Sequence, residues 1–402
     1  MTPRYDAVIL GAGAAGLYAA GIAAQRGLKV LLVDHARAPG EKIRISGGGR
    51  CNFTNLGTGP QAFLSENVHF AKSALARHGP AEFIALLRRH AIAFHEKTSG
   101  QLFCDGSARQ VVDMLVAELA GAELRLSTPV GPVTREGRDF RVSLAQGAVA
   151  APNLVLATGG LSIPKMGATG LAYRIAAQFG LGVTETRPAL VPLVFGGADL
   201  AWMAALSGLS LPVVASVVAS AGGTRFEEAL LFTHRGLSGP AILQVSSYWR
   251  EGGSIALDLL PGSPPAKTLA WLRRRKREAG ARGLAAVLAE RLPARLAASL
   301  AGRHARPAPL AELADAELAA LAGMLGASRL TPAGSEGYRT AEVTLGGVAT
   351  SALDARTLEA RAVPGLHVIG EAVDVTGWLG GYNFQWAWSS AHACATALRP
   401  RE

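Results

Sequence analysis

The chain opens with a hydrophobic pattern typical of a strand, a helix and a second strand. Residues 5–10 and 28–33 are apolar enough to form strands buried on both faces. Between them, residues 14–26 carry apolar side chains at helical spacing, and Gly27 ends the helix. We therefore expect a βαβ unit with parallel strands.

Later segments change pattern several times. Residues 188–260 are β-rich, whereas residues 265–325 are rich in Ala, Leu and Arg at helical spacing. An α/β pattern then returns, which indicates one domain interrupted by an insertion. Further helices are expected at 72–94, 107–120 and 382–398, short strands at 123–149, and buried strands at 153–157, 342–345 and 366–369.

Composition excludes several classes of protein. The chain has 402 residues, 49% of them hydrophobic, so it can form two or three domains and is not disordered. Three cysteines are too few for a disulfide framework, so we expect reduced thiols and a cytoplasmic location. We see no export signal at the start, and glycines interrupt the apolar stretch 188–224, so no membrane partner is expected. Without C-x-x-C or H-E-x-x-H spacing, we also expect no metal.

The charge allows two interpretations. There are 40 basic and 30 acidic side chains, a formal net charge of +10, and only seven of the basic residues are Lys. An Arg- and Ala-rich chain can simply reflect genome composition, yet Arg is also the side chain best suited to phosphate. Residues 273–277 are five consecutive cations on an expected helix, either a solvated surface or a contact to an RNA backbone.

Residues 11–16 read Gly-Ala-Gly-Ala-Ala-Gly and fit the G-x-G-x-x-G pattern between the first strand and the helix. In that pattern Gly11 permits a tight turn, Gly13 lets a pyrophosphate approach the backbone, and Gly16 lets the helix pack closely. Asp34 follows the second strand, where a carboxylate accepts hydrogen bonds from ribose hydroxyls. A dinucleotide site is favoured, and a turn that merely packs a helix on a sheet is the alternative.

The dinucleotide could be NAD or FAD. We see no second G-x-G-x-x-G motif between a strand and a helix, as a two-domain reductase would carry. Other glycine clusters lie at 46–50, 158–160 and 380–381, and the end of the chain returns to the first domain. Loops so far apart in the chain suit a long ligand, which favours FAD.

Longer motifs carry a family resemblance. Residues 42–55 (Lys-Ile-Arg-Ile-Ser-Gly-Gly-Gly-Arg-Cys-Asn-Phe-Thr-Asn), 336–347 and 370–388, with the blocks 95–104 and 232–240, make the whole chain resemble the BaiN-like (YhiN-like) flavoproteins. The YhiN branch is the most similar. The resemblance implies an α/β fold, in which a Rossmann-like FAD-binding domain is interrupted by a β-barrel-like plus helical insert.

The expected divisions follow from that fold. The FAD-binding domain would comprise residues 1–187 and 334–402, the β-rich insert 188–262 and the helical insert 263–333.

The resemblance also implies contacts to FAD. The loop 46–52 would wrap the flavin side, residues 370–371 would approach the ribityl chain, and 380–383 would start a helix aimed at the pyrimidine edge. A helix N-terminus there supplies N–H donors and a positive dipole end to the negative charge of reduced flavin. The implied contacts, together with those of the glycine motif, are Gly11, Gly13, Ala14, Ala15, Gly16, Asp34, Lys42, Ser46, Gly47, Gly48, Gly49, Arg50, Cys51, Asn52, Val130, Thr158, Gly159, Gly160, Gly370, Glu371, Gly380, Gly381, Tyr382 and Asn383. Later in that helix, Phe384, Trp388 and Leu398 are expected in the core.

The reaction implied by the resemblance is NAD(P)H-driven reduction of a conjugated C=C bond. The YhiN branch is associated with reducing uridine in large-subunit ribosomal RNA to 5,6-dihydrouridine. Without a second nucleotide domain, NAD(P)H would be a transient reductant. Two alternatives stay open: a small-molecule flavoenzyme (an ene-acid reductase or an amine oxidase), or a non-catalytic flavin-containing RNA-binding factor.

Reduction of uracil needs an acid that protonates C5 after hydride reaches C6. A thiol suits this role because its pKa of about 8.5 keeps it protonated near neutrality. We expect Cys104 on a solvent-facing turn and Cys51 in the flavin loop, with His95 as a further candidate. Before Gly236, His234 and Arg235 could bind substrate phosphate or carboxylate. For each of these residues, a purely structural role is the alternative.

Overall fold

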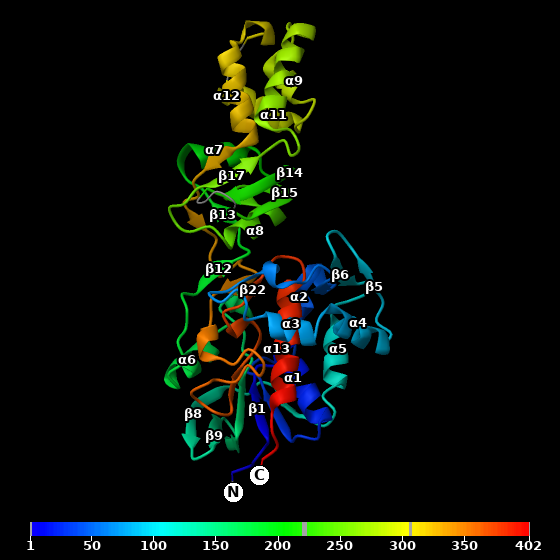
Figure 1. The fold of residues 1–402 in the computed structure, drawn as a ribbon, viewed down its shortest axis with the longest axis vertical. Coiled ribbons are helices and arrows are strands. Elements are labelled where there is room, and N and C mark those ends of the chain that lie inside the picture. Colours follow the sequence, from blue (N-terminus) through cyan, green and yellow to red (C-terminus); the bar gives the residue numbers. More distant parts are fainter. Residues whose placement is uncertain (1, 219–222, 305–307, 402) are drawn as a thin grey trace. The chain divides into compact units, whose positions relative to one another are not determined.

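The computed structural model describes residues 2–218, 223–304 and 308–401, and the chain divides into two compact units (Figure 1). Unit 1 comprises Met1–Pro188 and Val343–Glu402, and unit 2 comprises Ala189–Glu342. The chain returns to unit 1 at residue 343, nine positions later than the expected division at 334. The reason is strand β19 (Gly334–Ser335), which pairs with β13 (Leu193–Val194) and so belongs to unit 2.

Unit 1 is built on a parallel five-stranded sheet with the order β21-β11-β1-β2-β7. All four residues of the central strand β1 are buried, which explains its uninterrupted apolar sequence. The register pairs Ala7 with both Val30 and Asn153, so the first and second expected strands are neighbours. The strands are β1 (Ala7–Leu10), β2 (Val30–Val33), β7 (Glu123–Arg125), β11 (Asn153–Leu156) and β21 (Leu366–Val368).

Helix α1 (Ala14–Gln25) connects β1 to β2 and packs against the last helix of the chain, α13 (Tyr382–Ala397). Trp388 of α13 is fully buried and stacks on Phe83, with ring centroids 4.1 Å apart. Leu398 is buried too, and Phe384 packs against the core while half-buried, as the hydrophobic pattern indicated.

Smaller sheets surround this core. An antiparallel meander consists of β8 (Val130–Glu136), β9 (Asp139–Leu144) and β10 (Gly147–Ala151), and a second antiparallel sheet has the order β3-β6-β5. Its strands are β3 (Asn52–Asn55), β5 (Phe94–Glu96) and β6 (Gln101–Cys104).

The helix expected over 72–94 is two helices, α3 (Lys72–Arg77) and α4 (Pro80–Arg89). The expectation of one continuous helix was wrong because Pro80 cannot continue a helix and starts a new one at its N1 position. The helix expected over 107–120 is α5 (Arg109–Ala117).

Unit 2 contains an antiparallel seven-stranded sheet with the order β18-β17-β14-β15-β16-β13-β19. Its long central pair is β14 (Ser210–Val217) and β15 (Arg225–Thr233), and Leu211 and Val213 of β14 alternate into the core. The other strands are β13, β16 (Gly236–Ser238), β17 (Ile255–Asp258), β18 (Ser328–Leu330) and β19.

The Ala-, Leu- and Arg-rich stretch of unit 2 forms the helices α9 (Pro265–Glu278), α10 (Leu284–Leu288), α11 (Ala294–His304) and α12 (Asp315–Gly326). Two further helices, α7 (Gly197–Ala205) and α8 (Pro240–Ser246), lie in the segment 188–260, which was expected to be β-rich. The long helices α9 and α12 pack against each other (Figure 1). Helices α10 and α11 also pack against each other. In the part of the chain that the structure describes, no helix combines the length and the apolar character that crossing a membrane requires.

Candidate functional site

The glycine turn after β1 has the geometry that its sequence predicted. Gly11 has φ +108°, and a Cβ there would lie 2.5 Å from the carbonyl oxygen of Ala157. A Cβ on Gly16 would lie 1.8 Å from the oxygen of Gly11, so only glycine lets α1 approach the turn this closely. Gly13 is different, because a Cβ there would meet nothing within 4 Å. The space beside Gly13 is therefore open to a ligand.

Among the residues that the structure describes, no side chain caps α1 at its N-cap residue, Gly13, so backbone N–H groups of its first turn stay available. Ala14, Ala15 and Gly16 form that first turn. The arrangement fits an anion, because free N–H groups and the positive end of the helix dipole point to the same place.

Asp34 closes the other side of the glycine turn. Its Oδ2 accepts a hydrogen bond from the N–H of Ala12 (2.6 Å), and its Oδ1 accepts one from Ala36 (2.8 Å). The carboxylate is therefore fixed beside the turn, although 22 positions separate it from Ala12. This is the place where an acidic residue can accept hydrogen bonds from a ribose.

The segment 46–52, expected as a loop, begins where the helix that precedes it loses its regular geometry. Helix α2 (Glu41–Gly49) loses helical geometry at Ser46, Gly47 and Gly48, and both glycines have positive φ angles. A Cβ on Gly47 would lie 2.8 Å from the ring of Phe103, so a side chain there would clash with β6. The expected contacts Ser46, Gly47, Gly48, Gly49, Arg50, Cys51 and Asn52 thus lie on one tight backbone turn that leads into β3.

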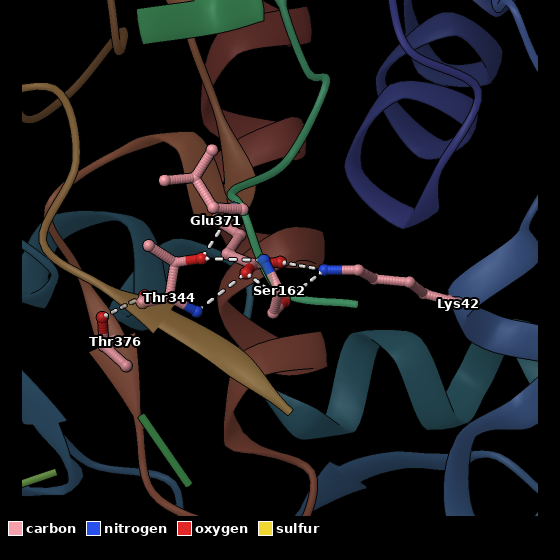
Figure 2. Close-up of polar contacts among 6 residues, drawn as sticks. Lys42, Ser162, Thr344, Glu371 and Thr376 are labelled. Atoms are coloured by element: carbon pink, nitrogen blue, oxygen red, sulfur yellow. Dashed lines mark hydrogen bonds and ion pairs between the residues drawn. The ribbon is translucent and has the colours of Figure 1, made fainter. Parts of the chain in front are cut away.

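Lys42, on α2, ends in a polar cluster that joins segments far apart in the chain (Figure 2). Its Nζ donates to Oγ of Ser162 (2.6 Å) and to Oε2 of Glu371 (3.0 Å). Oε1 of Glu371 accepts from the Ser162 hydroxyl (3.0 Å) and from the N–H of Thr344 (2.9 Å). Thr376 donates its hydroxyl to the carbonyl oxygen of Thr344 (3.1 Å), which fixes that strand.

Electrostatics keep this cluster charged. Burial by itself would raise the pKa of Glu371, but the Lys42 ammonium and the donors of Thr344 and Ser162 outweigh it and hold that pKa below its usual range. An ammonium has three N–H donors. Among the described residues, two of those of Lys42 are engaged, and its side chain is 33% exposed, so one donor remains for a ligand.

Sequence reasoning placed Lys42 and Glu371 at the site but missed Ser162 and Thr344. Ser162 follows the expected contacts 158–160 by two positions, and Thr344 lies within the family-like block 336–347, so each is close in sequence to a segment expected at the site. What the sequence could not show is that a Cβ on Gly160 would lie 2.4 Å from the Thr344 hydroxyl.

Three further expected contacts, Thr158, Gly159 and Val130, have defined structural surroundings. Gly159 has φ +71°, and Thr158 accepts a hydrogen bond from the N–H of Ala172 at the start of α6 (Leu171–Gln178). Val130 lies at the start of β8, half-buried, opposite Leu144.

The start of α13 is held against β3. A Cβ on Gly381 (φ +97°) would lie 2.4 Å from the carbonyl oxygen of Thr54, and the oxygen of Gly380 accepts a hydrogen bond from the Asn55 side chain (2.9 Å). Asn383 bonds both the N–H and the carbonyl oxygen of Gly377, so its amide holds a turn.

Near this helix start, the ring of Tyr382 packs edge-on against Phe63. Gly370 has φ +64° and accepts a hydrogen bond from the indole of Trp386, which ties the Glu371 segment to α13.

The candidate acids lie in and beside the β3-β6-β5 sheet. Cys51 and Cys104 are both fully buried, so the expected solvent-facing turn for Cys104 was wrong: the residue ends β6 with its side chain in the core. Burial raises the pKa of Cys104 to about 11 and raises that of Cys51 further, so both stay protonated thiols. His95 is exposed and its Nδ1 lies 2.6 Å from Oδ1 of Asp105.

His234 and Arg235 lie in unit 2, on the exposed turn between β15 and β16. Arg235 forms a long ion pair with Glu336 (3.6 Å). The remaining expected residues lie in unit 1, where the segments around residues 11, 34, 42, 160 and 371 are joined by the contacts above.

Residues 5–397 match the family described as HI0933-like protein Rossmann domain. The chain belongs to this HI0933-like family. The match covers nearly the whole sequence and confirms the family resemblance and the Rossmann-type fold expected from the motifs.

Three curated proteins are similar to this chain over nearly their full length. The chain is 50% identical over 398 residues to the ribosomal RNA dihydrouridine synthase of Escherichia coli (strain K12), with 98% of each chain covered. It is 43% identical over 405 residues to the Haemophilus influenzae protein of the same name, with 99% of each covered. The 3-dehydro-bile acid delta(4,6)-reductase of Clostridium scindens is 27% identical over 410 residues, with 98% of each covered.

Proposed function

We propose that this protein is an FAD-dependent oxidoreductase that reduces uridine in large-subunit ribosomal RNA to 5,6-dihydrouridine, with NAD(P)H as a transient reductant. The observation that carries the proposal is the 50% identity, over 98% of both chains, to a ribosomal RNA dihydrouridine synthase. The match extends over nearly the whole of both chains, so it includes the segments of both units.

The residues present fit FAD. The open space beside Gly13, the uncapped start of α1 and the fixed carboxylate of Asp34 offer a pyrophosphate and a ribose the partners that they need. A carboxylate at this place also disfavours a 2′-phosphate. The start of α13, with Gly380 and Gly381, would hold the flavin pyrimidine edge.

When bound, FAD supplies a hydride for C6 of the uracil ring. The chain would supply the proton for C5, for which Cys104 and Cys51 are the candidates, with His95 as the third. Burial raises the pKa values of both thiols, so they are protonated at neutral pH but are weaker acids than a free thiol. Proton transfer from either thiol to C5 would therefore require the buried side chain to reach the substrate, whereas His95 is already exposed. Lys42, with one free donor beside Glu371, would orient a bound group.

His234 and Arg235 would contact the phosphate of the RNA substrate. Both are exposed on one turn of unit 2, where a cation can meet a phosphate without a desolvation penalty.

A small-molecule substrate is the second candidate. The similarity to a bile acid reductase supports it, since that protein's name indicates reduction of conjugated C=C bonds. The chain is only 27% identical to the bile acid reductase, but 50% and 43% identical to the two ribosomal RNA dihydrouridine synthases. Ribosomal RNA is therefore the stronger proposal.

The test uses the purified protein with bound FAD and an unmodified transcript of large-subunit ribosomal RNA. With NADPH or NADH, we expect one or more uridines to gain two hydrogens, detected by mass spectrometry of the digested RNA. Reactions without a nicotinamide, and with a Gly13→Ala variant, are the controls. Unchanged RNA combined with rapid reduction of a small enone would favour the second candidate.

A further inference from the structure

The insert helices of unit 2 carry most of the excess positive charge of the chain. Residues 265–304 contain ten Lys and Arg side chains and two carboxylates, Glu278 and Glu290. The formal net charge of the whole chain is +10, so this short stretch supplies most of it. If genome composition alone set the charge, it would be spread more evenly along the chain.

Helix α9 separates its cations into two groups. The first group is neutralised: Arg273 lies 2.9 Å from Asp315, and Arg275 lies 2.6 Å from Glu290. Lys276 joins the Asp315 pair at 3.5 Å, and Arg282, beyond the helix, joins Glu290 at 2.6 Å. Asp315 and Glu290 therefore have two basic partners each.

The second group faces solvent. Lys267, Arg274 and Arg277 are exposed, and within the described ranges none of them has an acidic partner inside 4.0 Å. Their spacing of seven and three residues places them along one face of the helix. At 1.5 Å per residue, the row extends about 15 Å along the axis, which matches several consecutive phosphates of a nucleic acid strand.

Buried side chains next to this row anchor α9 in unit 2. Thr268, Trp271 and Leu272 are buried, and the Arg291 guanidinium lies 4.3 Å from the centre of the Trp271 ring. The cations of the exposed row are thus presented on a helix that is fixed in unit 2 by its own core.

A membrane surface fits this face poorly. Helices that lie on membranes bury large apolar side chains in the lipid, whereas Trp271 and Leu272 of α9 point into the protein. The large hydrophobic side chains exposed among the described residues, Ile45, Leu56, Val68, Val116 and Val183, all belong to unit 1. A polyanion without apolar groups is the partner that this chemistry recognises.

We propose that the row Lys267, Arg274 and Arg277 on α9 binds the phosphate backbone of the RNA substrate. The identity of that RNA rests on the proposed function, but binding can be measured without turnover. Backbone contacts of this kind hold an RNA without reading its sequence. The row would raise the affinity for the RNA while leaving the choice of uridine to the active site.

The experiment compares two double variants of the full-length protein. Arg274→Gln/Arg277→Gln removes two cations of the row. Arg273→Gln/Arg282→Gln removes two charges nearby, and Lys276 and Arg275 still neutralise Asp315 and Glu290. Binding of a fluorescein-labelled large-subunit ribosomal RNA fragment is followed by anisotropy over a salt series.

We expect Arg274→Gln/Arg277→Gln to weaken binding about tenfold or more at low salt and to reduce the slope of log K against log salt by ~1.4 to 1.8. The control variant should keep nearly the wild-type slope. Equal losses in both variants, no loss in either, or binding to anionic vesicles in place of RNA would each overturn the proposal. Failure of uridine reduction alongside these binding changes would instead count against the proposed function only.

Discussion

The ammonium of Lys42 lies 3.0 Å from Oε2 of Glu371, although 329 positions separate the two residues in the chain. The contact joins α2, near the start of unit 1, to the segment after β21, near its end. Ser162 and Thr344 form hydrogen bonds to this pair, so the ion pair connects four segments of the chain.

Breaking this pair should destabilise the protein. Glu371→Gln leaves the Lys42 ammonium without its counter-charge, and we expect a loss of about 1–3 kcal/mol in the free energy of unfolding. Lys42→Met should cost a similar amount, because it leaves a largely buried carboxylate unpaired. Urea unfolding of both single variants and of the double variant gives the coupling energy. If the two single effects simply add, the pair has no net interaction.

Two glycines of one motif should respond in opposite ways to a single methyl group. Gly16→Ala places a Cβ 1.8 Å from the oxygen of Gly11 and should prevent normal folding. Gly13→Ala places it in open space, so without FAD the variant should unfold at nearly the temperature of the wild-type apoprotein, while it binds much less FAD. Thermal unfolding together with the 450-nm absorbance per protein checks both. A Gly13→Ala protein with a full complement of FAD would contradict the proposed pyrophosphate position.

The buried His78 should make stability depend on pH. Burial, with a smaller contribution from the neighbouring His392, lowers the pKa of His78 to about 4. Its ring lies 2.9 Å from the Tyr18 hydroxyl and stacks on His392. Below the unfolded pKa of about 6.5, the unfolded chain takes up a proton that the folded chain refuses.

Stability should therefore fall as the pH drops from about 6.5 to 4, by up to about 1.4 kcal/mol per pH unit for this one group. His78→Gln, which can still bond Tyr18, should reduce the difference between urea unfolding at pH 7 and at pH 5. An identical pH dependence in variant and wild type would show that His78 does not titrate in this way.

Thiol accessibility gives a fourth prediction. All three cysteines, Cys51, Cys104 and Cys394, are free and buried, and burial raises the pKa of each. At pH 8, an aromatic disulfide reagent should label almost no thiol in the native protein and all three in guanidinium. Rapid labelling of one native cysteine would mean that the segment around it opens.

A fifth prediction concerns the proton donor. If Cys104 supplies the proton, Cys104→Ser should bind FAD and oxidise NAD(P)H normally but form dihydrouridine at least about 100-fold more slowly. Cys51→Ser is the matched variant for the neighbouring thiol. Normal dihydrouridine formation by both variants would leave His95 as the remaining candidate.

The hydrophobic pattern predicted the fold well where the structure of a segment depends mainly on residues adjacent in the sequence. The strand at 7–10, its glycine turn and α1 are local, because burial and backbone geometry follow from adjacent residues. The close approach of Gly16 to Gly11 was predictable for the same reason, whereas the approach of Gly11 to Ala157 joins two segments that are far apart in the chain. Pro80 in the sequence indicates a helix break, but the helical spacing of apolar residues continues on both sides of it and favoured a longer helix.

Features that depend on contacts across the chain were not predictable. The burial of Cys104 depends on pairing with β3 and β5, and the late return to unit 1 depends on β19 pairing with β13. Thr344 and Ser162 contact Glu371 only in the folded chain, because the residues of this cluster come from segments far apart in the sequence.

The split of unit 1 has a consequence for synthesis of the protein. Strand β21 and helix α13 are encoded after unit 2, yet the first half of the parallel sheet needs both to cover β11 and α1. At about 5–20 residues per second, the ribosome translates unit 2 in roughly 10–30 seconds before those elements emerge. During that interval the nascent chain exposes an unfinished sheet edge, so chaperones that shield apolar strands should determine the yield of folded protein.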